Sequence, residues 1–278
     1  MGRENKMIEE TTIRSWNSLM KKFEEISMHG DMYNGFSVLF RGEGDKKWGI
    51  RSTLERRAGA KTFDLVNYYN RINHFIDELN SFKNEKWELP RGGIEEIRRE
   101  VLSENTRSSN LELLWLELLI YLRHHGFPSP LIDWSMSPIV ALYFCLKDMK
   151  GECDGAVYCF QENFRESNGR GVSSPITNVI GPYITTHRRH FLQQANYTVS
   201  GVKNYYGEGL ALESVTLMNF MDCLRDESNR HKVTKIIIKN KFRKEFLRRI
   251  MDFNINDYVL FNSEDSLIET FACKSFDI

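Results

Sequence analysis

Several features that would mark a specialised protein are absent from this sequence of 278 residues. It has no excess of either charge, because Lys+Arg and Asp+Glu both number 38. A uniformly basic nucleic-acid-binding surface and an acidic tail are therefore excluded, although a local basic patch is not. The 5 cysteines are an odd number, widely spaced and without a CxxC pair. The spacing predicts neither a disulfide framework nor a cysteine zinc site.

Long hydrophobic runs are also absent. The richest, residues 111–122, is interrupted by Glu112 and Glu117 and falls short of the roughly 18 apolar residues that a membrane span needs. The first residues contain no apolar stretch of the kind found in signal peptides. At least one thiol must stay free, which fits a reducing compartment. We therefore expect a cytoplasmic protein without a membrane partner.

Familiar catalytic motifs are missing as well. The sequence contains no Walker loop, GxGxxG, HExxH or GxSxG pattern. P-loop hydrolysis, Rossmann-type hydride transfer and zincin proteolysis are disfavoured, and no metal is expected.

The composition is that of a globular protein, with 41% hydrophobic and 12% aromatic residues. Apolar spacing predicts helices at residues 13–26, 63–82, 111–123, 138–146 and 241–251, strands at 36–40, 155–160, 235–239 and 254–261, and a long irregular loop at 165–184. Helices gather early and strands late, which favours an α+β fold with a helix-rich N-terminal half packed on a small mixed or antiparallel sheet. We expect a single domain over residues 1–278, with a helical segment at about 61–123.

The first candidate site is Arg41-Gly42, at the end of the predicted strand 36–40. An arginine there can present its planar fork to a phosphate or carboxylate at the rim of a cleft. Gly42 would let a ligand approach the backbone closely. The alternative is an arginine in a structural ion pair.

The second candidate is the run 123–144, where polar residues surround a glycine-proline turn between two apolar helices. His124 titrates near neutrality in its ordinary state and can act as an acid or a base. Asp133 could orient a histidine or a ligand hydroxyl. Ser135 or Ser137 could instead cap the following helix.

The third candidate lies within residues 187–199, where Arg188 and Arg189 form part of a basic cluster ahead of Gln193 and Gln194. A glutamine side chain can orient a base, a ribose or a carboxamide by hydrogen bonding. The alternative is a solvated basic turn before a strand.

Together the three sites resemble the FRG domain, a family named for its Phe-Arg-Gly motif. The matching segments are residues 40–42, 124–128, 132–135, 137–138 and 141–144, followed by Arg189 with Gln193 and Gln194. The resemblance extends over residues 13–271. Pro130, Ser135 and Ala195 stand where the family has Arg, Thr and Gly, and these differences bear on substrate choice rather than on the fold.

A weaker resemblance connects the chain to ADP-ribosyltransferases of the arginine–serine–glutamate type. Those enzymes place an Arg-Gly on an early strand, then a serine-containing strand that leads into a helix, then a Glu-x-Glu turn before a strand. Here the corresponding order is Arg41-Gly42, residues 133–135 leading to 141–144, and Gln193-Gln194 before 197–199. This resemblance implies an ADP-ribosyltransferase-like fold and NAD as a substrate.

The resemblance also implies roles for individual residues. Arg41 with Gly42 would hold the NAD pyrophosphate, and Ser135 and Gln193 would shape the site around it. Asp133 would supply the carboxylate that stabilises an oxocarbenium-like transition state, or Gln194 would occupy the glutamate position.

His124 would contact the adenylate ribose or act as a base, and Arg188 and Arg189 would bind the acceptor substrate. The expected activity is therefore an NAD-dependent ADP-ribosyltransferase, a bacterial toxin or phage-defence effector. Its target would be nucleic acid, because residues 187–190 and 230–249 supply a local basic surface. An antitoxin or regulator would be a partner.

Two other functions remain open from the residues. One is a non-catalytic module that binds or senses a nucleotide through Arg41. The other is a metal-independent ribonuclease with His124 or His125 as acid and base and Arg189 on the phosphate.

Overall fold

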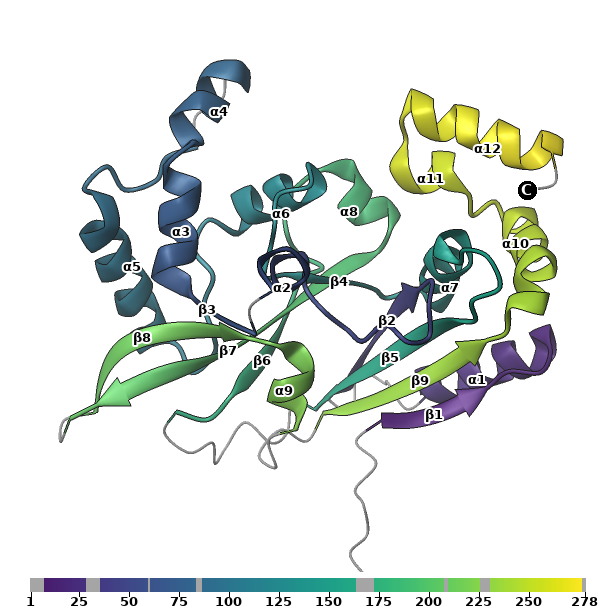
Figure 1. Cartoon of the computed structure of the whole chain (residues 1–278), viewed down its shortest axis with the longest axis horizontal. Helices are drawn as coiled ribbons and strands as arrows, with labels where there is room; N and C mark the ends of the chain where they lie inside the picture. Colours follow the sequence, from purple (N-terminus) through teal and green to yellow (C-terminus); the bar gives the residue numbers. More distant parts are fainter. Residues whose placement is uncertain are drawn as a thin grey trace, which may run out of the picture.

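The computed structural model is organised around one curled sheet of nine strands (Figure 1). It describes residues 8–28, 36–59, 61–83, 87–163, 173–207, 210–225 and 231–276. The strands are β1 (Ile8–Thr12), β2 (Phe36–Glu43), β3 (Thr62–Asp64), β4 (Ile132–Ser135), β5 (Gly155–Asn163), β6 (Ile176–Ile180), β7 (Ala195–Tyr206), β8 (Ala211–Met218) and β9 (Lys232–Ile238). Their order is β1-β9-β5-β2-β4-β7-β8-β3, and β6 pairs with β7 outside this path.

Neighbouring strands in this order are antiparallel, except that β1 runs parallel to β9. The mixed sheet is compatible with the α+β class expected from the sequence. The sheet is larger than expected, because it has nine strands. These strands come from both halves of the chain rather than mainly from the second half. In β7, polar residues such as Asn196 and Lys203 are buried together with the apolar ones. The strand therefore lacks the alternation of apolar and polar residues by which it could be predicted.

Twelve α-helices accompany the sheet in the described ranges. They are α1 (Trp16–Met28), α2 (Thr53–Ala58), α3 (Leu65–Asn73), α4 (Ile76–Lys83), α5 (Gly93–Arg107), α6 (Leu116–His124), α7 (Pro138–Asp148), α8 (Arg188–Leu192), α9 (Phe220–Leu224), α10 (Arg243–Asp252), α11 (Asp257–Phe261) and α12 (Glu264–Phe276), with a short 3-10 turn at Asn240–Phe242. None of these helices has the length and apolar character that crossing a membrane requires.

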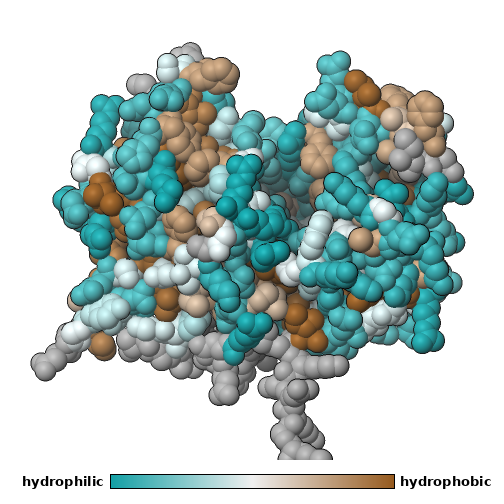
Figure 2. All heavy atoms as spheres, viewed as in Figure 1, coloured by the Kyte–Doolittle hydropathy of each residue, from teal (hydrophilic) through white to brown (hydrophobic). Residues whose placement is uncertain are grey.

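Many of the helices form two lobes over one side of the sheet, whereas α9 packs with Leu39 and Trp134 in a separate cluster. Figure 1 shows α3, α4 and α5 over one end, and α10, α11 and α12 over the other, with α2, α6 and α8 between them. Figure 2 shows that the molecular surface is hollowed between these lobes and that hydrophilic residues border much of the hollow.

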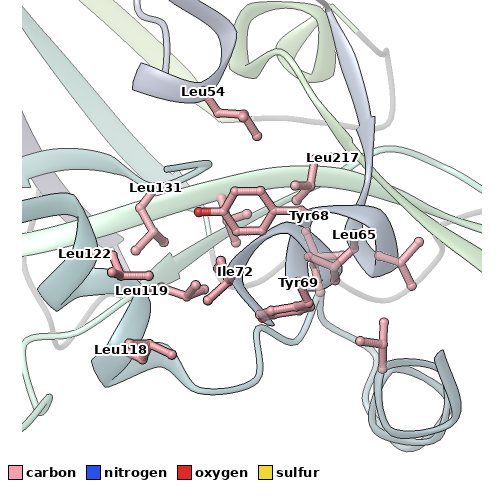
Figure 3. Packing of buried hydrophobic residues seen from close by; sticks show 14 of the residues in the cluster. Leu54, Leu65, Tyr68, Tyr69, Ile72, Leu118, Leu119, Leu122, Leu131 and Leu217 are labelled. Carbon is pink, nitrogen blue, oxygen red and sulfur yellow. The ribbon is translucent and has the colours of Figure 1, made fainter. Parts of the chain in front are cut away.

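Each lobe has its own core. In the first, Tyr68 of α3 lies among leucines of neighbouring elements, including Leu122 and Leu131 (Figure 3), and its hydroxyl donates to the carbonyl of Pro128 at 2.9 Å. In the second, helices α1, α7 and α10 pack on the half of the sheet that contains β2, β5 and β9. This division leaves the middle strands, β2 and β4, at the boundary between the lobes.

Strand β2 is buried on both faces. Phe40 packs with α1 and α7, whereas Leu39 packs on the opposite face with Trp134 and Phe160. This double burial explains why the strand is a continuous apolar run rather than an alternating one. The strand therefore delivers Arg41 and Gly42 from a rigid position in the centre of the sheet.

The strand expected at residues 254–261 is wrong, because the structure has α11 there. Asn256 caps this helix by accepting the Val259 N–H at 3.1 Å, and Asn262 ends it in the left-handed conformation with φ 50°. Local capping at both ends outweighs the β propensity of the short apolar run.

Two expected helices have different boundaries. The helix over 63–82 is divided into β3, α3 and α4, and Asp64 caps α3 by accepting the Asn67 N–H at 2.8 Å. The helix expected from residue 111 begins only at Leu116, because Trp115 just before it adopts the left-handed conformation with φ 50°. The loop expected at 165–184 contains β6, while its residues 165–172 lie outside the described ranges.

Candidate functional site

A cavity of about 340 Å³ lies between the two lobes, above the centre of the sheet. Strands β2 and β4 form its floor, and α2, α6, α7, α8 and α11 contribute to its walls. The lining residues are Phe40, Arg41, Gly42, Thr53, Arg56, Arg123, His124, Asp133, Trp134, Ser135, Ala141, Phe144, Asp148, Arg189, Gln193, Ala195, Tyr197 and Phe261. The cavity is within the size range of small-molecule sites.

Most of the residues singled out from the sequence meet here. Those that line the cavity are Arg41, Gly42, His124, Asp133, Ser135, Arg189 and Gln193. Gln194 and Arg188 do not line it, and both are exposed. The structure therefore brings the three sequence segments together. Of the two neighbouring pairs, Gln193 and Arg189 line the cavity, and Gln194 and Arg188 do not.

Arg41 is held in a fixed orientation. Its Nε donates to Glu43 Oε1 at 2.7 Å, and its Nη1 donates to the backbone carbonyl of Asp133 at 2.8 Å. Only 12% of the Arg41 side chain is exposed. The structural ion pair considered as an alternative for Arg41 is therefore present, with Glu43 as the partner. It orients the Arg41 guanidinium, which also lines the cavity.

Gly42 has a packing requirement. A Cβ on this residue would lie 2.0 Å from the carbonyl oxygen of Ala141 and 2.5 Å from the nitrogen of Cys145, both in the backbone of α7. The absence of a side chain at Gly42 therefore allows helix α7, rather than a ligand, to approach strand β2 closely. The tight contact places the first turns of α7 directly beside Arg41.

Asp133 forms a two-pronged ion pair with Arg123, whose Nε and Nη2 each donate to one carboxylate oxygen. Burial acts to raise the pKa of Asp133, but the charge and hydrogen bonds of Arg123 prevail, so that the pKa lies below its ordinary value. The Arg123 side chain is 9% exposed, whereas that of Asp133 is 47% exposed. The carboxylate is therefore ionised, matched by a cation, and open to the cavity.

Arginine side chains gather around the cavity. Arg56 enters from α2, Arg123 from α6 and Arg189 from α8, in addition to Arg41. Partial burial and the positive charge of Arg41 lower the pKa of Arg56. Arg123 is matched by Asp133 and Arg41 by Glu43, so Arg56 and Arg189 supply the surplus of positive charge over Asp148 that makes the cavity suited to an anion.

His124 is neutral in this setting. Burial lowers its pKa to about 4 from the ordinary value of 6.5, an effect that the Asp133 carboxylate only partly opposes. Its Nε2 is buried and has no hydrogen-bond partner among the described residues. The imidazole can exchange a hydrogen bond with a ligand, but it is a weak base at neutral pH.

Ser135 supports the cavity wall. Its hydroxyl donates to the backbone carbonyl of Gln193 at 2.8 Å and accepts the Ser137 N–H at 3.0 Å. Ser137, not Ser135, caps α7 by accepting the Val140 N–H. The Gln193 amide is directed to the carbonyl of Leu260 at 3.1 Å, so it ties α8 to α11.

Phe261 lines the cavity wall, although it was not among the candidate site residues of the sequence. Its ring lies 5.4 Å from the guanidinium of Arg189 and 5.1 Å from Lys147 Nζ, and it meets Phe144 edge-on at 6.0 Å. A flat apolar wall beside cations can accept a ring of a ligand. Because the sequence pattern predicts a strand at residues 254–261, it does not place Phe261 near the cavity.

Two further residues of the cavity were missed. Arg123 belongs to the run 123–144 but lies in the last turn of an apolar helix, and only its spacing of ten residues from Asp133 could have suggested a pair. Arg56 is one of two adjacent arginines in α2, and the sequence does not indicate which one lines the cavity.

No group of three or more His, Cys, Asp or Glu residues that could hold a metal ion occurs in the described ranges. In comparisons with known proteins, the model of the FRG domain family matched residues 37–153. This match supports the FRG resemblance over the segment that supplies β2, α2, α6, β4 and α7. No curated protein and no solved structure matched the chain.

Proposed function

We propose that the cavity binds NAD and that the chain transfers the ADP-ribose group of NAD to an acceptor. The observation that carries this proposal is the convergence of Arg41, Asp133, Ser135 and Gln193 on one arginine-rich cavity. A dinucleotide contains a pyrophosphate with two negative charges, which matches the oriented guanidinium of Arg41 and the nearby Arg56.

The remaining residues have complementary roles in this proposal. Asp133 presents the carboxylate to which the sequence resemblance assigns this role, and its negative charge favours an oxocarbenium-like ribose. Ser135 and Gln193 act through the backbone they hold, because both side chains are occupied by protein partners. Phe261 offers a flat surface to the nicotinamide ring.

The reaction breaks the bond between ribose C1′ and the nicotinamide nitrogen, and the electron pair of that bond leaves with nicotinamide. An oxygen or nitrogen of the acceptor then bonds to C1′ and releases its proton to solvent. The lowered pKa of His124 makes it a poor proton acceptor, so its role is a hydrogen bond to a ribose hydroxyl.

The proposal extends to a nucleic-acid acceptor. Arg188 is exposed on α8, next to the cavity residue Arg189. Helix α10 adds further basic residues, although Arg230, expected as part of this surface, lies outside the described ranges. A toxin or phage-defence effector that is controlled by an antitoxin would follow from such an activity.

The test is incubation of the purified chain with NAD labelled in its adenylate half, together with RNA, DNA or protein acceptors. We expect release of nicotinamide and transfer of label to an acceptor, both lost in Arg41→Ala. Arg57→Ala, an exposed change on α2, is the matched control and should retain activity. No consumption of NAD with any acceptor would contradict the proposal.

The second candidate function is a non-catalytic module that binds a nucleotide. It is favoured by the pairing of Asp133 with Arg123, which compensates the charge of that carboxylate, and by the position of Gln194 outside the cavity lining, which removes the amide expected to hydrogen-bond the ribose. Calorimetry would identify it by nucleotide binding without turnover. The ribonuclease alternative fits less well, because His124, with a pKa of about 4, is a weak base at neutral pH and His125 does not line the cavity.

A further inference from the structure

A second hollow, of about 380 Å³, adjoins the cavity. The two hollows share Arg41, Gly42, Arg56 and Asp148 as lining residues. They therefore meet at the guanidinium groups that were assigned to the pyrophosphate. A molecule with a phosphate pair at its centre and a ring system at each end would match this division.

The distinctive residue of the second hollow is Trp48, whose side chain is exposed although it is large and apolar. Its residue exposure is 43%, against 9% for Trp16 and 2% for Trp134. The next residue, Gly49, has open space where a side chain would be, with no atom within 4 Å of an added Cβ. An aromatic ring beside open space offers a stacking surface to a flat ligand.

The segment that carries Trp48 is firmly anchored. The Trp48 carbonyl accepts a hydrogen bond from the buried Tyr158 hydroxyl at 2.7 Å, and its N–H donates to the Asp45 carbonyl at 2.9 Å. Just before it, Lys46 pairs with Asp154 at 2.9 Å. The exposed ring is thus presented by a fixed backbone, which reduces the entropy cost of binding a ligand.

Polar groups complete the second hollow. Arg51 lines it and is exposed, Glu43 lines it while paired with Arg41, and Asp148 lines both hollows. A carboxylate in this position can accept hydrogen bonds from the hydroxyls of a ribose, as acidic residues do in other dinucleotide sites. Trp48 lines only the second hollow, whereas Asp148, Arg41 and Arg56 line both hollows, so a base stacked on Trp48 would leave its ribose and phosphates to the shared residues.

We propose that the second hollow is the subsite for the adenosine half of the dinucleotide, with the base stacked on Trp48 and the ribose hydroxyls on Asp148. This inference rests on the proposed function, since it names how the same site extends over its substrate. It predicts that the chain recognises the adenosine diphosphate portion independently of the nicotinamide.

The experiment measures binding of ADP and of nicotinamide mononucleotide to the full chain by calorimetry, and ADP-induced changes in tryptophan fluorescence. We expect Trp48→Ala to weaken ADP binding about tenfold or more and Trp48→Phe to retain most of it, because a ring that can stack remains. Nicotinamide mononucleotide binding should change less than twofold in both variants. Trp48→Phe should also lose the fluorescence response to ADP, while Phe82→Ala, an exposed aromatic change on α4, should behave as wild type.

The outcomes separate the two proposals. ADP binding that depends on Trp48, without consumption of NAD, would retain the subsite and overturn the transferase. Transfer of ADP-ribose with the same KM for NAD in wild type and Trp48→Ala would retain the transferase and overturn the subsite. Absence of binding by ADP and by nicotinamide mononucleotide to the wild-type chain would overturn both.

Discussion

The guanidinium of Arg41 donates a hydrogen bond from Nη1 to the backbone carbonyl of Asp133, at 2.8 Å. The two residues are 92 positions apart in the chain, on strands β2 and β4. This contact joins the first two sequence motifs into one wall of the cavity. The Asp133 side chain pairs with Arg123. The backbone carbonyl of Asp133 thus orients Arg41, and its carboxylate orients Arg123.

The first prediction concerns Arg41. Lysine keeps the charge but loses the planar fork, so Arg41→Lys should weaken ADP binding about tenfold or more, given roughly 1.5–3 kcal/mol for a hydrogen bond to a charged group. Calorimetry measures the change, and thermal unfolding verifies that the variant is folded. Unchanged affinity in a folded variant would remove Arg41 from the binding site.

The second prediction concerns Gly42. Alanine would place its Cβ against the backbone of α7, and backbone atoms cannot move aside without displacing the helix. We expect Gly42→Ala to lower the free energy of unfolding by about 3 kcal/mol or more. Gly49→Ala is the control, because its Cβ would meet no atom within 4 Å, and it should change stability by less than about 0.5 kcal/mol. Urea denaturation measures both; equal stabilities would show that α7 does not constrain residue 42.

The third prediction concerns the ion pair of Asp133 and Arg123. Asp133→Asn leaves the mostly buried Arg123 guanidinium without its counter-charge, and should cost about 1–3 kcal/mol of stability at pH 7. This is less than the loss of a fully buried pair, because the carboxylate is partly exposed.

The dependence of this effect on pH has a definite sign. The pKa of Asp133 is lower in the folded than in the unfolded chain, so its contribution is present above the ordinary pKa of about 3.9 and is lost as the pH falls through the folded value. The stability difference between wild type and Asp133→Asn should therefore narrow below about pH 4. A difference that stays constant down to pH 2 would contradict the pairing.

The fourth prediction concerns His124. Its folded pKa of about 4 lies below the ordinary value of 6.5, so between these values the unfolded chain binds a proton that the folded chain does not. The contribution of His124 to stability is hence complete above pH 6.5 and is lost as the pH falls toward 4. NMR titration of the imidazole should give a pKa near 4, and His124→Ala should remove that part of the pH dependence of unfolding. A pKa near 6.5 would show that the ring is hydrated rather than buried.

The sequence predicted the parts of the site that depend on strongly patterned segments. The apolar run before Arg41 and the proline at the start of α7 were sufficient to predict β2 and the helix beside it. Of the residues that the resemblance singles out, Arg41, Asp133 and Ser135 line one cavity, whereas Gln194 does not.

Other parts depend on long-range contacts that the pattern does not encode. Phe261 reaches the cavity because α11 is tied to α8 through the Gln193 amide and the Leu260 carbonyl. Gln194 turns away because its backbone adopts φ 48° and its carbonyl accepts the N–H of Met136. Tertiary contacts, rather than the order of the glutamines, decide which of them faces the cavity.

The most direct test of the account is a crystal structure of the full chain with ADP-ribose. The account predicts that the pyrophosphate lies within hydrogen-bond distance of Arg41 and Arg56, with adenine against Trp48. A pyrophosphate bound away from both arginines, or its absence from the cavity at saturating ADP-ribose, would contradict the central claim that these guanidinium groups form a dinucleotide site.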